Sequence, residues 1–207
     1  TIFAVNVDGT FNVLEACRES GIQALVFSSS MAYGWGSVYS VTKVLGEELC
    51  RSYHEMTGAS VVMLRYHEFV PASYLTYGVR LLRNGVDRSD VASATLAALR
   101  ASVERRVERF CTIVHTDHGM PPEVIGDFQR LGPGWCEQQV PGARHLIDKY
   151  SLDLPAKVEQ HDLSAAARDL DWRPAVGFVE FLRDLSKRDG RREDVQPLWV
   201  PGALPLS

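Results

Sequence analysis

Tyr39 and Lys43, with three serines just before them, form the group in this sequence best suited to acid–base chemistry. The two residues open an expected helix, where side chains four positions apart share a face. An ammonium beside a phenol favours the phenolate, so the pair can accept and return a proton. A hydroxyl from Ser28-Ser29-Ser30, at the end of an apolar run, can hydrogen-bond a carbonyl or an alcohol. Such a group can move a proton while a bound cofactor moves a hydride.

The elements that must position these residues alternate between helices and buried strands. A short, fully apolar run at residues 24–27 predicts a strand buried on both faces, and mostly apolar runs predict further strands at 60–65 and 110–114. Helical spacing and end signals predict helices at 3–20, 39–56, 74–82, 89–102, 164–170 and 177–187. This order favours an α/β fold with a doubly wound parallel sheet. Proline and glycine become frequent beyond residue 115, so we expect one domain over 1–115 and a small lobe over 116–207, ending in an extended arm.

Composition excludes several classes of protein. The chain is 45% hydrophobic and 23% charged, with a net charge of -4, which suits a globular protein and favours neither nucleic acid nor an anionic membrane. No apolar run approaches the roughly 20 residues that a membrane span requires. No two of the four cysteines form a CxxC pair, so we expect a reduced, cytoplasmic protein.

Ordered motifs along nearly the whole chain resemble the extended short-chain dehydrogenase/reductases, the NAD-dependent epimerase/dehydratase family. They are Asn6–Ala16, Val26–Ser29 with Tyr33-Gly34, Tyr39–Lys43 with Gly46-Glu47-Glu48, Leu64-Arg65-Tyr66, Gly85–Ala92 and Asp162–Pro174 with Phe178 and Phe181-Leu182. The resemblance implies a Rossmann-like sheet, NAD or NADP as cofactor and a small-molecule substrate. It also implies a homodimer that pairs through the helices carrying Asn6 and Tyr39.

The resemblance assigns roles by motif position. Tyr39 is the expected acid/base, Lys43 binds the nicotinamide ribose, and Ser29 takes the catalytic serine position, with Ser28 or Ser30 serving if the register differs by one. The expected cofactor-binding residues are Ser28, Tyr39, Lys43 and Tyr66. Ser30, His67 and Glu68 are the expected substrate contacts, and no metal is expected.

Three features depart from the family's pattern. The sequence has no GxxGxxG loop, whose backbone N–H groups meet the pyrophosphate in the family. The connection from Tyr33 to Tyr39 is short, and the family's Asn after the Leu-Arg-Tyr strand is replaced in the stretch from Tyr66 to Pro71. Two interpretations of the first departure remain open. The natural protein either has further residues before Thr1, or is a shortened member that works without the cofactor or with a partner chain.

Two polar segments have weaker functional interpretations. His115-Thr116-Asp117-His118 offers imidazoles and a carboxylate, but a metal centre needs three or four convergent ligands, so a solvated loop is favoured over a substrate contact or a metal site. Arg188 and the arginines after it are expected to lie at a solvated helix end.

The sequence therefore predicts an NAD(P)-dependent oxidoreductase, epimerase or dehydratase acting on a small carbonyl or alcohol, sugar-like or otherwise, through Ser29, Tyr39 and Lys43. The alternative is a degenerate family member that binds a ligand or a partner without redox catalysis, which the missing glycine loop favours and the retained tyrosine and lysine oppose.

Overall fold

The computed structural model describes residues 1–200, which divide into two compact units. Unit 1 comprises Thr1–His67, Val91–Val114 and Asp162–Arg173, and unit 2 comprises the remaining described residues. The predicted division after residue 115 coincides with one place where the chain leaves unit 1. It differs from the observed division in two segments: residues 68–90 belong to unit 2, and residues 162–173 belong to unit 1.

A three-stranded parallel sheet forms the centre of unit 1. The strands β1 (Ala24–Ser30), β2 (Ser60–Tyr66) and β4 (Arg109–Val114) stand in the order β1-β2-β4. Five consecutive residues of β2, Ser60–Leu64, are buried, as an apolar strand covered on both faces requires. The register places Ser29 beside Arg65 and Ser30 beside Tyr66. The predicted α/β fold with a parallel sheet is confirmed, and each of its three strands is found within three residues of its expected ends.

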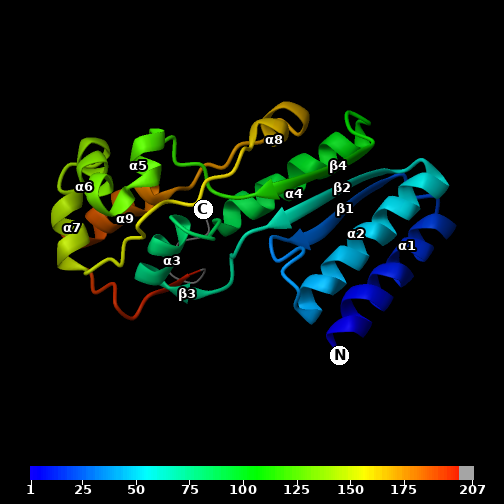
Figure 1. The fold of residues 1–207 in the computed structure, drawn as a ribbon, viewed down its shortest axis with the longest axis horizontal. Coiled ribbons are helices and arrows are strands. Elements are labelled where there is room, and N and C mark those ends of the chain that lie inside the picture. The colour runs from blue at the N-terminus through cyan, green and yellow to red at the C-terminus, as the bar shows by residue number, and fades with distance from the viewer. Residues whose placement is uncertain (201–207) are drawn as a thin grey trace. The chain divides into compact units, whose positions relative to one another are not determined.

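Helices cover the two faces of this sheet (Figure 1). On one face, η1 (Ala4–Asp8) leads into α1 (Gly9–Glu19), which packs against α2 (Val38–Thr57). The other face meets α4 (Arg88–Val103), where Thr95 contacts the hydroxyl of Tyr66 at 2.6 Å. Unit 1 also contains the short helix α8 (Ser164–Asp169). Neighbouring side chains of a strand point to opposite faces of the sheet, so consecutive residues of β1 and β2 pack against different helix layers.

The position of α2 follows from its ends and from one glycine. The helix begins after Ser37, whose side chain accepts a hydrogen bond from the backbone N–H of Ser40, and it ends at Gly58 in the left-handed region, φ 66°. Gly46 lies against the ring of Phe27, and a Cβ at this position would stand 2.4 Å from the ring. Glycine therefore allows α2 to approach β1 closely, next to the residues of the expected site.

Unit 2 is a helical unit with its own core. It contains α3 (Tyr74–Leu81), α5 (Pro122–Gly126), α6 (Phe128–Gln139), α7 (Ala143–Lys149) and α9 (Phe178–Gly190), and β3 (Ala72–Ser73) pairs antiparallel with β5 (Trp199–Val200). Phe128 and Phe178 are fully buried and meet edge to face, with ring centroids 6.1 Å apart. The three helices α5–α7 were not predicted: α5 and α7 are short, and Pro133 lies inside α6 and obscures its helical pattern.

Within residues 1–200, no helix combines the length and the hydrophobicity that a transmembrane span requires.

Candidate active site

Tyr39 and Lys43 lie together on the first turns of α2. The ammonium of Lys43 is 5.5 Å from the centre of the Tyr39 ring and donates to the backbone carbonyl of Ser28 at 3.0 Å. The side chain of Lys43 also lies over the ring of Phe27. Tyr39 is 39% exposed, and its hydroxyl hydrogen-bonds no other residue in the described part of the chain. The predicted pair is thus brought together at an open surface, with the phenol available to a ligand.

The three serines at the end of β1 have different surroundings because the strand pleat separates them. Ser29 is 4% exposed, and its hydroxyl donates to the carboxylate of Glu47 at 2.6 Å. Ser28 is exposed, and half-buried Ser30 accepts a hydrogen bond from the backbone N–H of Ala32 at 3.1 Å. Ser30 therefore retains a proton to donate, whereas the proton of Ser29 is already engaged.

Glu47 is the centre of a buried ionic network on the same helix. Its side chain is fully buried, and Arg65 donates to its two oxygens from Nε and Nη2, both at 2.8 Å. Arg51 adds a third charged contact at 3.1 Å, and the guanidinium of Arg65 lies 3.7 Å from the centre of the Tyr33 ring. Burial alone would raise the pKa of Glu47, but the hydrogen bonds from Arg65 and Ser29 outweigh it and lower that pKa.

This network was not predicted, although the sequence carries a signal for it. Glu47 follows Lys43 by four residues, as Lys43 follows Tyr39, so the three share one stripe of α2. Its partner Arg65 lies 18 residues further along the chain, on a strand that reads as apolar. A buried carboxylate requires such a partner, and only the fold shows which arginine supplies it.

Tyr66 and His67, expected to contact cofactor and substrate, follow one another at the end of β2. The hydroxyl of Tyr66 is engaged with Thr95, and burial raises its pKa. His67 is 5% exposed, and its backbone N–H donates to the carbonyl of Val114 at 3.1 Å. Neither side chain is presented at an open surface in the way that Tyr39 is.

Glu68, the other expected substrate contact, lies at the rim of a pocket contained within unit 2. Its carboxylate accepts from Arg80 at 3.1 Å and from Asn84 at 3.0 Å, while Arg80 itself is 8% exposed. The pocket has a volume of about 620 Å³, and its wall includes Pro71, Leu75, Val79, Tyr150 and Leu152. Polar residues that include Thr76, Asn84 and Gln196 complete the lining, so the pocket combines a fixed, half-exposed carboxylate with mixed polar and apolar walls.

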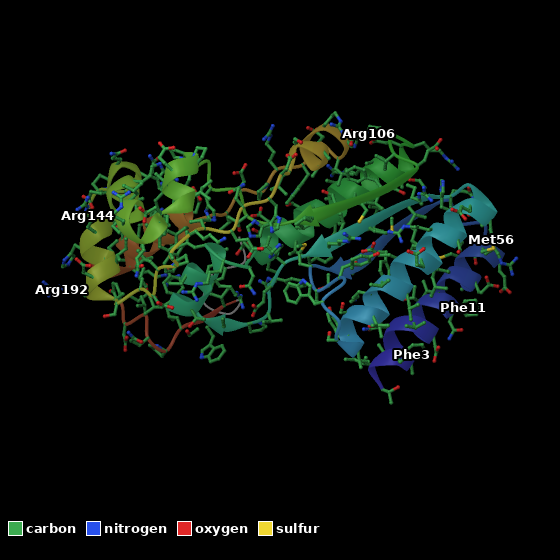
Figure 2. All side chains as sticks on the ribbon, viewed as in Figure 1. Phe3, Phe11, Met56, Arg106, Arg144 and Arg192 are labelled. Atoms are coloured by element: carbon green, nitrogen blue, oxygen red, sulfur yellow. The ribbon has the colours of Figure 1, made fainter. Side chains whose placement is uncertain are left out.

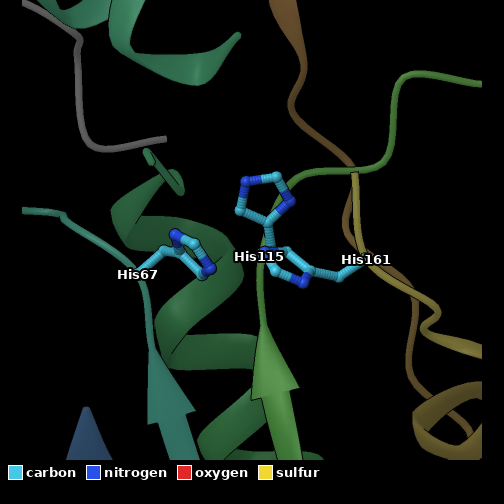
Figure 3. A group of neighbouring side chains, drawn as sticks. All are labelled: His67, His115 and His161. Carbon is cyan, nitrogen blue, oxygen red and sulfur yellow. The ribbon is translucent and has the colours of Figure 1, made fainter. Parts of the chain in front are cut away.

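The histidines after β4 are buried rather than solvated, contrary to the interpretation of that segment as a solvated loop. His118 is 9% exposed; its Nε2 donates to the carbonyl of Leu81, and burial lowers its pKa to about 4. His115, directly after β4, is fully buried and meets His161 edge to face, with ring centroids 4.9 Å apart (Figure 3). Carbonyl acceptors inside unit 2 explain how both imidazoles are accommodated.

Arg188 is likewise buried, and the expectation of a solvated position is wrong. It is 9% exposed and binds Asp184 and Glu193, with its guanidinium over the ring of Tyr74. Two carboxylates and an aromatic face compensate the burial of its charge.

Unit 1 exposes apolar side chains along η1, α1 and the outer edge of β1. Phe3, Val5 and Phe11 are 46%, 72% and 51% exposed, and Figure 2 labels two of them on this part of the chain. A groove of about 350 Å³ between α1 and β1 is lined by aliphatic residues that include Val5, Val13 and Val26. Apolar surface of this extent is typical of a region that contacts another protein segment.

Comparison with known proteins gives a consistent result. Residues 1–73 match the sequence model of the NAD dependent epimerase/dehydratase family. An uncharacterized UDP-glucose epimerase of Bacillus subtilis is 40% identical over 77 residues, covering 30% of this chain and 24% of that protein. A UDP-glucuronate 4-epimerase of Thermodesulfobacterium geofontis is 22% identical over 213 residues, covering 86% of this chain and 62% of that protein.

Solved structures share the fold. A UDP-galactose 4-epimerase superposes with a TM-score of 0.57 and 21% identity, over 92% of this chain and 71% of that one. The UDP-glucose 4-epimerase of Brucella ovis, solved with NAD, gives 0.57 and 16%, over 87% and 69% of the two chains. The present chain spans less than two thirds of each curated relative it matches. Residues 1–73 thus match the NAD dependent epimerase/dehydratase family, as the motifs in that part of the chain predicted, and the chain shares the fold of these solved epimerases.

Proposed function

We propose that the chain carries the proton-transfer half of an NAD(P)-dependent oxidoreductase, epimerase or dehydratase site. The observation that carries this proposal is the Tyr39–Lys43 pair, with the phenol exposed and the ammonium beside it. Tyr39 is the proposed acid/base, which exchanges a proton with a hydroxyl or carbonyl oxygen of a small substrate. When bound, NAD or NADP would supply the hydride chemistry.

The side chains available on α2 suit the ribose side of such a cofactor. The ammonium of Lys43 has three donors, and one is used on the carbonyl of Ser28. The others, together with the hydroxyl of Tyr39, can bind a vicinal diol. The 207 residues include no glycine-rich loop for a pyrophosphate, so only the ribose and nicotinamide side is assigned to this chain. Ser28 and Tyr66 stay predictions as further cofactor contacts.

The hydroxyl that assists Tyr39 is proposed to come from Ser30 ahead of Ser29. The proton of Ser29 is held by Glu47, whereas that of Ser30 is available at the end of β1. Replacement of Ser30 by Ala should therefore lower turnover more than replacement of Ser29 by Ala. Equal losses of turnover would support Ser29 as the catalytic serine, as its motif position implies. His67 and Glu68 stay predictions as substrate contacts.

NADH titration of the purified chain tests the proposal, with fluorescence and melting temperature as readouts. Binding with a raised melting temperature, weakened in Lys43→Ala, is the expected result. Lys187→Ala is the matched control, because this lysine lies on α9 in unit 2. A well-folded sample that shows no response to NADH or NADPH would contradict the proposal.

One observation favours a second candidate, a ligand-binding protein without redox chemistry. The pocket at Glu68 is formed by unit 2 alone and needs no nucleotide to be complete. Its paired charges, Glu68 with Arg80 and Arg83 with Asp153, leave no excess charge for an ionic ligand. A sugar that raises the melting temperature while NADH has no effect would support this candidate.

The relatives' names extend the proposal to a substrate class. Several act on UDP-sugars by name, and a sugar-like alcohol is therefore among the substrates to test. The exposed side chains of η1 and α1 support a homodimer, with Phe11 on its interface. Light scattering should give a dimer for the parent chain and a monomer for Phe11→Asp, and a monomeric parent chain would contradict it. The cytoplasmic location stays a prediction.

A further inference from the structure

Glu47 connects the two elements that hold the proposed site. It lies one turn beyond Lys43 on α2, and its carboxylate accepts from Ser29 of β1 and from Arg65 of β2. Both strand residues are neighbours in the sheet register, so one side chain fixes the helix against two adjacent strands. Lys43 in turn reaches the carbonyl of Ser28, the residue directly before Ser29.

The network has the features of a rigid support. Glu47 is fully buried, and its oxygens accept four hydrogen bonds from Ser29, Arg51 and Arg65, those from Ser29 and Arg65 between 2.6 and 2.8 Å, besides a longer contact from the thiol of Cys111. Charge-assisted bonds of this length are stronger than neutral ones and restrict the geometry of both partners. The close packing of Gly46 on Phe27 holds the same turn of the helix to β1.

We propose that Glu47 is a positioning residue, which ties α2 to the ends of β1 and β2 and thereby fixes Lys43 beside Tyr39. The role of the pair itself rests on the proposed function, whereas the positioning is a property of unit 1. Ser29 is part of the same hydrogen-bond network. This explains why the serine at the family's catalytic position donates a hydrogen bond to Glu47. Side chains that leave catalytic groups intact can change turnover by altering their placement.

Lysine NMR tests the positioning without any measurement of activity. Lys43 is the one lysine among the unit 1 segments, and its ammonium lies 5.5 and 5.8 Å from the ring centres of Tyr39 and Phe27. Ring currents should therefore separate the ε-CH₂ signal of Lys43 from those of Lys149, Lys157 and Lys187 in a ¹³C-labelled chain. Lys43→Arg assigns the signal.

The expected result is a move of the Lys43 signal toward the other lysines in Glu47→Gln and a smaller move in Ser29→Ala. Two matched controls should leave it in place. Glu48→Gln changes the neighbouring, exposed carboxylate, and Tyr53→Phe removes a bond from α2 to the carbonyl of Ile22 at the far end of the helix. If Glu47→Gln fails to fold, Ser29→Ala decides.

Three results would overturn the inference. They are an unmoved Lys43 signal in folded Glu47→Gln, an equal move in Tyr53→Phe, which would indicate general loosening, and a parent signal that coincides with the other lysines. Because none of these readouts depends on cofactor or substrate, loss of the inference and loss of the proposed function are distinguishable. A chain that lacks turnover but shows the predicted shifts retains the positioning role.

Discussion

The two ends of one polar stripe on α2 differ in what surrounds them. Glu47 is fully buried and fully hydrogen-bonded, whereas Tyr39, two turns earlier, is 39% exposed and its hydroxyl bonds to none of residues 1–200. Lys43 stands between them and reaches the backbone of β1. The buried end stabilises the position of the helix, and the open end is able to react with a ligand. Their spacing in the sequence does not distinguish these two roles.

The open end should show the largest effect. Tyr39→Phe removes the proton donor and leaves the ring in place, so turnover should fall by about a thousandfold with little change in melting temperature. Steady-state assays with NADH or NADPH and a panel of small carbonyls and alcohols measure it. Tyr33→Phe is the control, because that ring lies on the guanidinium of Arg65. Retained turnover in Tyr39→Phe would remove the distinction between the two ends.

The buried end should show the next largest effect, and on stability. Glu47→Ala leaves Arg65 and Arg51 without their shared carboxylate, which should cost about 3 kcal/mol in the free energy of unfolding. Urea denaturation measures the loss, and Glu48→Ala should change the free energy by less than about 0.5 kcal/mol. A loss equally small in Glu47→Ala would show that the network contributes little to holding α2.

The sequence allowed most of unit 1 to be predicted. Apolar runs located β1 and β2, because a strand covered on both faces has few polar positions. The roles of Ser28, Ser29 and Ser30 could not be distinguished from the sequence, because the three residues are identical. The pleat of β1 points their side chains to different faces, and the hydroxyl of Ser29 bonds to Glu47. Unit 2 was more difficult to predict from the sequence. Gly132-Pro133-Gly134 disrupts the helical pattern of α6, and the position of His118 after an apolar strand is typical of an exposed loop, although this residue is buried.

The dependence of stability on pH should separate the contributions of His118 and Glu47. The pKa of His118 is lowered to about 4 by burial, so the unfolded chain takes up its proton first as pH falls below 6.5. Stability should fall between pH 6.5 and about 4, by about 3 kcal/mol from this residue. In His118→Gln that fall should flatten, as urea midpoints across pH would show. An unchanged pH profile would mean that His118 does not titrate in this way.

The carboxylate of Glu47 should act lower in the pH range. Because its pKa is lowered from 4.5 in the folded state, its contribution is present above that value and is lost as pH falls through the folded pKa. Glu47→Gln should flatten the profile below pH 4.5 and leave the His118 region unchanged. Flattening of both regions by one variant would show that the two groups are not independent.

The smallest effect is expected at the far end of α2. Tyr53 is 1% exposed, and its hydroxyl donates to the carbonyl of Ile22 at 2.7 Å. Tyr53→Phe should cost about 1 kcal/mol by urea denaturation, with turnover unchanged. Loss of turnover in this variant would mean that the whole helix, rather than Glu47, determines the position of the pair.

The measurement closest to the central claim is the response of the four lysine ε-CH₂ signals to NADH in the ¹³C-labelled chain. We predict that the Lys43 signal shifts on saturation with NADH, and that those of Lys149, Lys157 and Lys187 stay in place. Binding of NADH that leaves Lys43 unmoved, or that moves one of the other three instead, would contradict the assignment of Tyr39 and Lys43 to a nicotinamide site.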